Sequence, residues 1–451
     1  MTTDEGRAAR PRTRQLTPWQ AFCLQTSVVV FFLAGASAPT PLYATYQRQW
    51  HFSPITTTVI FGVYAVAILL ALLVVGSLSD HIGRRPVIFC SIVVQAAAVV
   101  VFAGADGVPA LLCGRLLQGL ATGTVVGAVG AGMIDVNRSA GTLANAVAPA
   151  AGTAVGALGS GLLVAFAPQP THLVYHVLLV IYVVQALGVL FMAETATRTP
   201  GALRSLRVSW TVPAQAHAPL VRAAAVVVAV WALAGFYGSL GPALVHRVIP
   251  GQGALLGGLA LSTLTACGAL TVLALRNAAP RTTMRVGAVA LIAGVGATLV
   301  SVTLGAAGLF FGGTAIAGVG FGAGFQGGIR TVVPLSEPHQ RSGLLSVMYL
   351  ISYLGFGLPT IIAGLLVVYG GGVERAAYEY GAAVMLLAAL AFAGTLGRRS
   401  GRIPAGQEIP SATPSGPAVD VCADACRAGS APQPLSSSHR RLPAHTRDEH
   451  R

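Results

Sequence analysis

Arg115 stands inside a long apolar stretch, in the segment RLLQGLATG, and Gln118 follows it three residues later. A guanidinium in an apolar environment is costly unless it is solvated or paired. Residues three apart share one face of a helix. We therefore expect Arg115 and Gln118 to face a polar cavity and to serve substrate binding or proton coupling. The alternative is that Arg115 extends outward to a polar interface.

A second charged group lies in the segment GSLSDHIGRRPV, between two apolar runs. Asp80 follows the end of the first run, where a negative charge is unfavourable against the helix dipole. It should pair with Arg84, with Arg85 or with the start of another helix, while Gly76 and Gly83 keep the turn tight. The alternative, that the arginines only anchor the topology, does not explain Asp80 or the two glycines.

The composition of the chain indicates a membrane protein. Of its 451 residues 54% are hydrophobic and 9% are charged, against about 25% charged in a soluble domain. About 20 apolar residues cross the hydrocarbon layer of a bilayer as a helix. Twelve such segments are predicted, over residues 20–43, 54–77, 86–104, 109–132, 140–166, 173–193, 221–246, 252–275, 285–304, 306–329, 342–368 and 376–396.

The distribution of arginine predicts the orientation. The chain has 28 basic residues, all arginine, and a net charge of +14. Because they fall in short connections and tails, they do not form a nucleic-acid-binding face. With a cytoplasmic N-terminus, only Arg48, Arg247 and Arg375 of the connecting segments lie outside. We expect both termini to be cytoplasmic and the chain to be a monomer in the plasma membrane.

The longest internal connection predicts an all-α membrane protein of two six-helix bundles. It is polar, contains two prolines and separates six spans from six. Transporters with two such halves bind substrate near the midplane between them. The expected parts are a cytosolic segment (1–17), an N-terminal bundle (18–195), a central cytoplasmic loop (196–220), a C-terminal bundle (221–398) and a disordered cytosolic tail (399–451).

Two motifs resemble those of the major facilitator superfamily. GSLSDHIGRR is similar to its signature between helices 2 and 3, with His81 where the family usually has arginine or lysine, and RLLQGLATG resembles its helix 4 pattern. The resemblance implies that Asp80, with Arg84 and Arg85, latches the bundles through the start of helix 11, near Ser342. It also implies a part for Arg115 in proton coupling.

By that architecture, helices 1, 4, 7 and 10 line the cavity. An aromatic pocket with few polar groups suits hydrophobic or amphipathic ligands. The alternative for each side chain is packing or contact with lipid. Besides Arg115 and Gln118, the candidates on these helices are Gln25, Trp231, Tyr237, Phe325 and Gln326.

The carrier of a transported proton stays open at this level. No predicted span has an acid at its middle. The carrier would be Asp80, Glu379 or a histidine such as His176 or His246, or there is none. The segment GTAVGALGSG resembles the family's antiporter motif in part and has Ala157 where that motif has proline.

These features predict a secondary transporter of small molecules that works by alternating access. The main hypothesis is proton-linked efflux of hydrophobic compounds or drugs. A metabolite or sugar importer or exchanger of the same superfamily, or a non-transporting membrane sensor, is the alternative. We expect no enzyme activity, metal or cofactor, because HExxH, GxSxG and Walker phosphate-loop motifs are absent from the sequence.

Overall fold

The computed structural model describes residues 15–76, 78–196, 199–200, 212–250, 254–337 and 341–396. These residues contain twelve helices that are long and apolar enough to cross a membrane. The expected tail, most of the N-terminal segment and most of the central loop lie outside the described residues. The expectations of a cytosolic N-terminus and a disordered tail therefore stay predictions.

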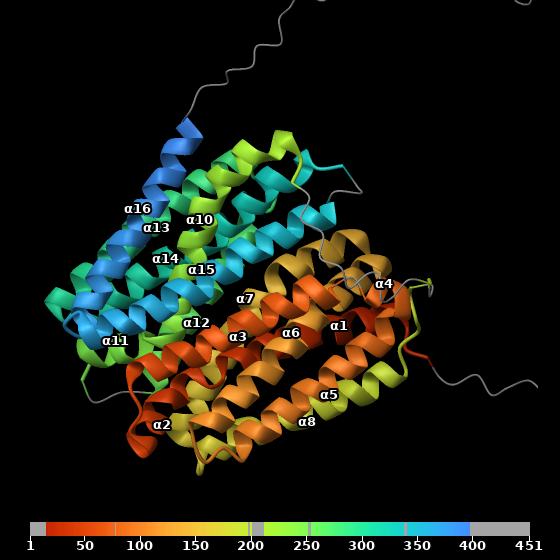
Figure 1. Cartoon of the computed structure of the whole chain (residues 1–451), viewed down its shortest axis with the longest axis horizontal. Helices are drawn as coiled ribbons and strands as arrows, with labels where there is room; N and C mark the ends of the chain where they lie inside the picture. The colour runs from red at the N-terminus through yellow and green to blue at the C-terminus, as the bar shows by residue number, and fades with distance from the viewer. Residues whose placement is uncertain are drawn as a thin grey trace, which may run out of the picture. The chain divides into compact units, whose positions relative to one another are not determined.

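The first group of helices packs into a six-span bundle. α6 lies at its centre and contacts α1, α3, α5 and α7, while α8 packs against α5 (Figure 1). Its elements are α1 (Pro18–Ser37), η1 (Thr40–Leu42), α2 (Tyr43–Trp50), α3 (Pro54–Val75), α4 (Ser79–Ile82), α5 (Arg84–Ala103), α6 (Val108–Val136), α7 (Arg138–Phe166) and α8 (Pro170–Leu190).

The second group forms a similar bundle around α14. This helix contacts α10, α12 and α13, and α16 packs against α13 and α10. Its elements are α10 (Ala214–Ser239), α11 (Gly241–Val248), α12 (Ala254–Ala274), α13 (Pro280–Leu304), α14 (Ala307–Val332), η2 (Val333–Leu335), α15 (Arg341–Tyr369) and α16 (Val373–Leu396). The prediction of twelve helices in two six-helix bundles is confirmed.

Local sequence explains where the helices begin and break. Thr17 and Gln20 form a capping box at the start of α1, and proline opens α3 and α13. Pro39 and Pro41 lack the N–H groups that would continue α1, so the chain passes through η1 before α2.

Several helix boundaries differ from the predicted spans, and the start of α10 is one of them. α10 begins at Ala214 and includes Pro219, seven residues before the predicted start of that span at 221. A proline near the start of a helix leaves its regular hydrogen bonds intact. α10 therefore includes the last seven residues of the predicted loop of 196–220.

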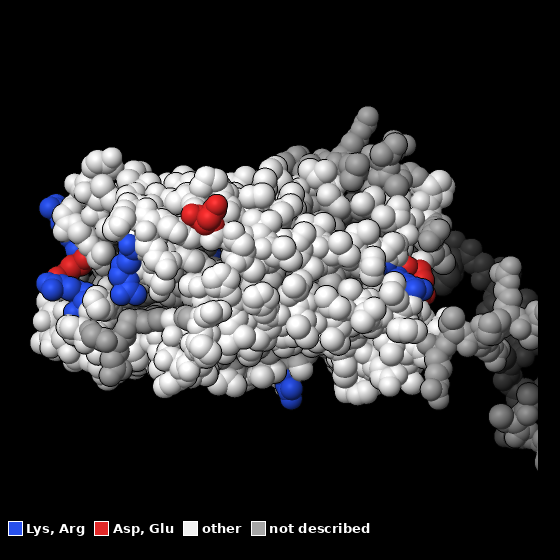
Figure 2. Space-filling view, turned by 90° about the horizontal axis from the view of Figure 1, so that it is seen from below, with Lys and Arg blue, Asp and Glu red and all other residues white. Residues whose placement is uncertain are grey.

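The alternation of the spans defines two ends of the described helices. We call the end with Pro18 and Leu396 the terminal end, and the end with α2 and α11 the far end. The apolar belt between them faces outward, with Val66 54% and Val184 62% exposed. Figure 2 shows a face that is largely uncharged between the two ends.

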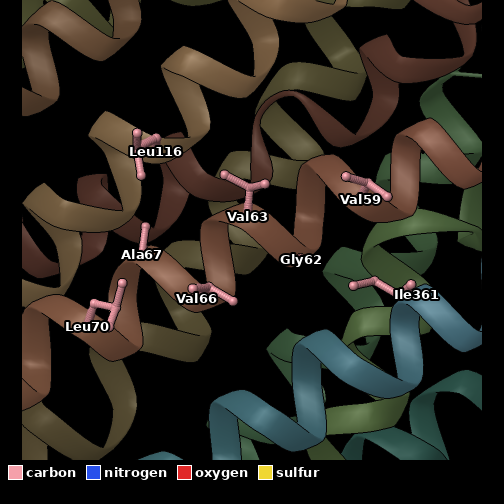
Figure 3. Close-up of a pocket in the computed structure, with 8 residues that line it drawn as sticks. All are labelled: Val59, Gly62, Val63, Val66, Ala67, Leu70, Leu116 and Ile361. Carbon is pink, nitrogen blue, oxygen red and sulfur yellow. The ribbon is translucent and has the colours of Figure 1, made fainter.

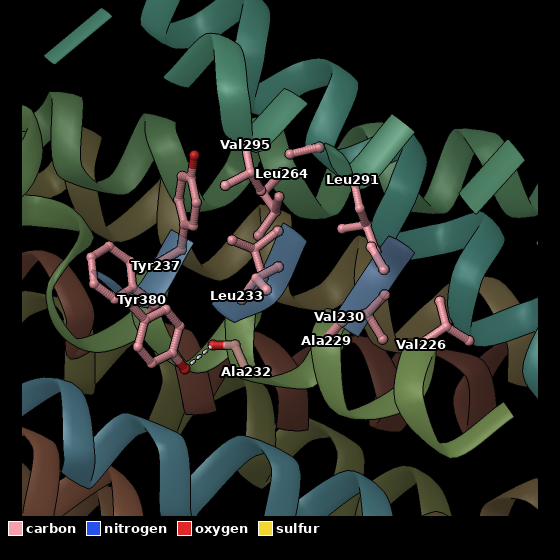
Figure 4. Close-up of a cluster of buried hydrophobic side chains, with 14 of the residues drawn as sticks. Val226, Ala229, Val230, Ala232, Leu233, Tyr237, Leu264, Leu291, Val295 and Tyr380 are labelled. Carbon is pink, nitrogen blue, oxygen red and sulfur yellow. Dashed lines mark hydrogen bonds between the residues drawn. The ribbon is translucent and has the colours of Figure 1, made fainter. Parts of the chain in front are cut away.

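Each bundle has its own buried core. In the C-terminal bundle, Leu233 of α10, Leu264 of α12 and Leu291 of α13 pack together, and Tyr380 Oη donates to Ala232 O at 2.8 Å (Figure 4). α13 and α14 come so close that a Cβ on Gly287 would lie 2.5 Å from Gly324 N. Close backbone approach at small residues is how helices associate in lipid.

Candidate functional site

Arg115 lies in the far half of α6 and is fully buried. Its Nε donates to Tyr43 Oη at 2.9 Å. Its Nη1 donates to Ala36 O and to Gln118 Oε1, each at 2.7 Å. The side chain therefore points into the bundle, and the alternative of extension to the interface is wrong for this conformation.

Aromatic rings surround the buried guanidinium. Its Cζ lies 4.9 Å from the ring centroid of Phe61, 5.2 Å from that of Tyr64 and 5.9 Å from that of Phe102. No ion pair to a carboxylate is found for Arg115 among the described residues. The positive charge is instead stabilised by carbonyl and phenol oxygens and by the faces of the rings.

Arg115 also stabilises the chain at the break between α1 and α2. Ala36 lies in the last turn of α1, where backbone carbonyls lack helical partners and the dipole is negative. Ser160 Oγ of α7 donates to Ala38 O, two residues further along, at 2.5 Å. Two side chains from neighbouring helices thus bind carbonyl groups at the end of α1, beside the break at Pro39 and Pro41.

A cluster of aromatic side chains joins the two bundles; we call it the Trp231 cluster, formed by Trp231, Phe321, Phe325, Tyr353 and Phe356. The ring centroid of Trp231 lies within 6.4 Å of the ring centroids of the other four. The distances are 5.3 Å to Tyr353, 5.5 Å to Phe325, 6.1 Å to Phe356 and 6.4 Å to Phe321. Phe356 lies 6.3 Å from Phe61 of the N-terminal bundle. Trp231 and Phe321 pack against both cores. This is where side chains of the two halves meet at mid-span.

The bundles are packed together in their far halves. A Cβ on Gly62 of α3 would lie 2.8 Å from Ile361 Cδ1 of α15, and one on Gly238 of α10 would lie 3.0 Å from Phe61 Cε1. A Cβ on Gly364 of α15 would come still closer to Thr58 Oγ1 of α3. These contacts close the seam between α3 and α15 toward the far end.

A pocket of about 260 Å³ lies along this seam (Figure 3). Every residue that lines it is apolar, and Val66 and Leu70 are about half exposed on the outer surface. The pocket therefore faces the hydrocarbon of the bilayer rather than the polar site at Arg115. Its lining residues are Val59, Gly62, Val63, Val66, Ala67, Leu70, Leu116 and Ile361.

The charged residues of the opening motif gather at the terminal end. Arg84 pairs with Asp80 and, at 3.4 Å, with Asp135 of α6. The Glu194 carboxylate accepts from the backbone N–H groups of Arg84 at 2.8 Å and Arg85 at 3.0 Å. A carboxylate at this position is favoured by the dipole at the start of α5.

The two glycines of the motif have separate functions. Gly83 has a φ of +106°, which favours glycine, and a Cβ there would lie 2.5 Å from Glu194 Oε2. A Cβ on Gly76 would meet Leu72 O of the preceding turn, and Gly127 of α6 packs against Gly76, where a Cβ on Gly127 would lie 3.1 Å from Gly76 O. Residues 338–340, before α15, lie outside the described residues, so the latch between the bundles stays a prediction.

The remaining candidates lie apart from Arg115. Gln25 packs against Gly132, which is 17 residues from Arg115 along α6, or about 25 Å. Tyr237 Oη bonds Thr314 Oγ1 at 2.9 Å inside the C-terminal bundle. Gln326 Nε2 donates to Val272 O at 3.2 Å. The structure thus joins Gln118 to Arg115 and Phe325 to Trp231, and leaves Gln25, Tyr237 and Gln326 in separate interhelical contacts.

Sequence reasoning missed several partners. Tyr43, Tyr64 and Phe61 surround Arg115, and Asp135 and Glu194 complete the charged group. The two acids were recognisable as charges at predicted helix ends on the same side as Asp80, but nothing in the spacing marked them as partners. The three aromatic residues had no signal beyond their position in apolar runs.

Neither histidine considered as a proton carrier lies inside a bundle. His176 and His246 are exposed. Glu379 is partly exposed in the first turns of α16 and pairs with Arg375 at 2.9 Å. Among the described residues, no group of three or more histidine, cysteine or acidic side chains could hold a metal ion.

Comparison with solved structures places this fold among transporters. A bacterial homologue of the human lysosomal transporter Spinster, in an inward-facing and unoccupied conformation, has a TM-score of 0.67 at 12% identity, over 84% of this chain and 97% of that one. The nucleoside transporter NupG has a TM-score of 0.61 at 15% identity, over 84% and 99%. The human organic anion transporter MFSD10 (TETRAN) has a TM-score of 0.61 at 17% identity, over 84% and 100%.

The sequence comparison identifies the family. No curated protein sequence matches the chain. The model of the Major Facilitator Superfamily matches residues 26–323, which is more than half of the chain and includes both motifs. The chain is therefore a multi-pass membrane transporter of the major facilitator superfamily, and not an enzyme.

Proposed function

We propose that this transporter moves hydrophobic organic molecules by alternating access and that the molecule binds at the Trp231 cluster. The observation that carries the proposal is the position of Trp231, whose ring touches residues of α14 and α15 and packs against the cores of both bundles. A ligand held there contacts both halves, so its binding responds to their relative movement. Aromatic side chains supply large apolar contact areas to such a ligand.

We propose proton-linked export as the mode of transport. The group that supports it is Asp80, because Arg84 is shared between Asp80 and Asp135. A proton on Asp80 would leave Arg84 paired with Asp135 alone and would weaken the Asp80 contact. Glu379 pairs with Arg375 of its own helix, and among the described residues no ion pair to another helix is found for Glu379, His176 or His246, so these three are less suited.

Transport assays in proteoliposomes test both parts. Labelled hydrophobic compounds are offered with an imposed pH gradient of either direction, with and without a protonophore. Trp231→Ala should lower transport at least tenfold, whereas Phe166→Ala, which removes a ring that is 78% exposed, should leave transport unchanged. Equal loss in both variants would contradict a binding site at Trp231.

Two alternative functions predict different results in these experiments. Net uptake or exchange of polar metabolites, unaffected by the protonophore, would identify an importer or exchanger. A sensor would lose its output when residues 400–451 are deleted, whereas a transporter should keep working without them. The fold shared with NupG and MFSD10 is compatible with either direction of transport.

A further inference from the structure

One face of α6 carries buried polar groups without hydrogen-bond partners. Arg115, Gln118 and Thr122 follow one another at intervals of three and four residues and are at most 1% exposed. Among the described residues, no partner is found for Arg115 Nη2 or Gln118 Nε2. Thr122 Oγ1 and Tyr64 Oη of the facing helix α3 interact with each other and have no further partner, and the Tyr64 ring lies 5.2 Å from the Arg115 guanidinium.

A further unpaired group comes from the other bundle. Trp231 Nε1 is buried and has no partner among the described residues. A row of aromatic rings connects Trp231 to Arg115. Arg115 Cζ lies 4.9 Å from the ring centroid of Phe61. The ring centroids of Phe61 and Phe356 are 6.3 Å apart, and those of Phe356 and Trp231 are 6.1 Å apart. The unpaired groups thus lie at both ends of one aromatic row that crosses the boundary between the bundles.

The unpaired nitrogen atoms of this row are all donors. Arg115 Nη2, Gln118 Nε2 and Trp231 Nε1 can only donate hydrogen bonds, whereas the hydroxyl groups of Tyr64 and Thr122 can donate or accept. The unpaired oxygens of Gln25, Gln95, Gln185 and Gln326 belong to contacts elsewhere, with Gly132, Tyr182, Ser27 and Val272. Thr40 Oγ1 of η1 is a further unpaired hydroxyl among the described residues. No carboxylate of the described residues pairs with Arg115, so the aromatic row is rich in donors and positively charged at one end.

We infer that the transported molecule is an aromatic compound that presents carbonyl or carboxylate oxygens to these donors and is neutral or anionic. Buried donors without partners gain most from an acceptor, and charged pairs are the strongest. A cationic ligand would be repelled by the positive charge of Arg115, because no carboxylate neutralises that charge. This repulsion would select against cations. This inference rests on the proposed binding site at Trp231 and specifies the class of molecule it takes.

A matched series of ligands tests the inference. One aromatic scaffold is prepared with an amide, a carboxylate or a primary ammonium group, and binding to the full-length protein in detergent is measured by quenching of tryptophan fluorescence. The amide and carboxylate should bind at least tenfold more tightly than the ammonium compound. Gln118→Glu supplies a carboxylate beside Arg115 and should reverse this order, at least between carboxylate and ammonium.

Gln185→Leu is the matched control, because Gln185 is also a buried glutamine of the N-terminal bundle but bonds Ser27. It should keep the wild-type order. Tighter binding of the ammonium compound by the wild type, or an order that Gln118→Glu does not change, would overturn the inference while leaving the Trp231 site intact. Binding of all three compounds that is insensitive to Trp231→Ala would instead contradict the proposed site.

Discussion

Pro41 and Gly258 meet across the boundary between the bundles, at the far end. A Cβ on Gly258 of α12 would lie 3.2 Å from Pro41 Cγ of η1 and would also meet the backbone oxygen of Ala157. The adjacent Gly257 receives Pro242 of α11, with 2.8 Å between the corresponding Cβ positions. One Gly–Gly pair therefore packs against the prolines at both helix breaks, and closure of the far end depends on the absence of side chains there.

Gly258→Val should shift the protein toward a conformation with a separated far end. The three added carbons, a Cβ and its two methyl groups, cannot fit between Pro41 and Ala157 without movement of a backbone. Spin labels at Arg48→Cys and Arg247→Cys, in a background free of other cysteines, should report a longer mean distance by pulsed electron resonance.

Gly159→Val is the control for that measurement. It also places a branched side chain on a glycine of α7, but no atom lies within 4 Å of a Cβ at this position. Its distance distribution should match that of the parent. An unchanged distribution in Gly258→Val would show that the contact with Pro41 does not govern closure.

Arg115→Lys should lower transport at least tenfold and destabilise the fold by about 1–3 kcal/mol. Lysine keeps the charge, but its single nitrogen cannot reach Tyr43, Ala36 and Gln118 in the geometry of the guanidinium fork. Transport assays and thermal unfolding in detergent measure the two effects. Arg138→Lys, at an exposed position, should change neither, and full transport by Arg115→Lys would show that charge alone suffices.

Glu194→Ala should destabilise the N-terminal bundle by about 1 kcal/mol, because the start of α5 loses the carboxylate that accepts from two of its backbone N–H groups. Thermal unfolding of the purified protein measures the change. Glu374→Ala breaks an exposed pair with Arg247 and should have an effect near zero. Equal effects of the two substitutions would contradict a capping role for Glu194.

Asp80→Asn should leave membrane insertion intact and lower transport. The substitution removes one of the two acids paired with Arg84 and keeps Asp135 in place. Surface expression and transport are measured together, with Asp106→Asn, an exposed acid near the far end, as the control. Normal transport by Asp80→Asn would remove Asp80 from both the latch and the proton pathway.

Tags at the two termini should be found on the same face of the membrane, and on the cytoplasmic face. The even number of spans requires the first statement, and the arginine distribution predicts the second. Protease protection of tagged protein in sealed vesicles of known orientation measures both. Tags on opposite faces would contradict the twelve-span topology itself.

The sequence alone determined the spans, the two-bundle fold and the family. In a bilayer each span must satisfy its own backbone hydrogen bonds, so apolar runs of sufficient length become helices wherever they pack. The motif at residues 76–85 and the Arg115–Gln118 spacing are likewise local, since both lie within one or two turns. For the same reason sequence reasoning could expect Arg84 as a partner of Asp80.

Only the tertiary structure decided which helix faces pack against one another. The sequence of an apolar helix says little about which of its faces is buried, because lipid-facing and buried positions have similar side chains. The rings around Arg115, the Trp231 cluster, the Glu194 cap and the contact of Pro41 with Gly258 all join residues far apart in the chain. Gln25 and Tyr237, which lie on helices expected to line the cavity, turn toward their own bundles instead, since packing and not composition sets the direction of a side chain.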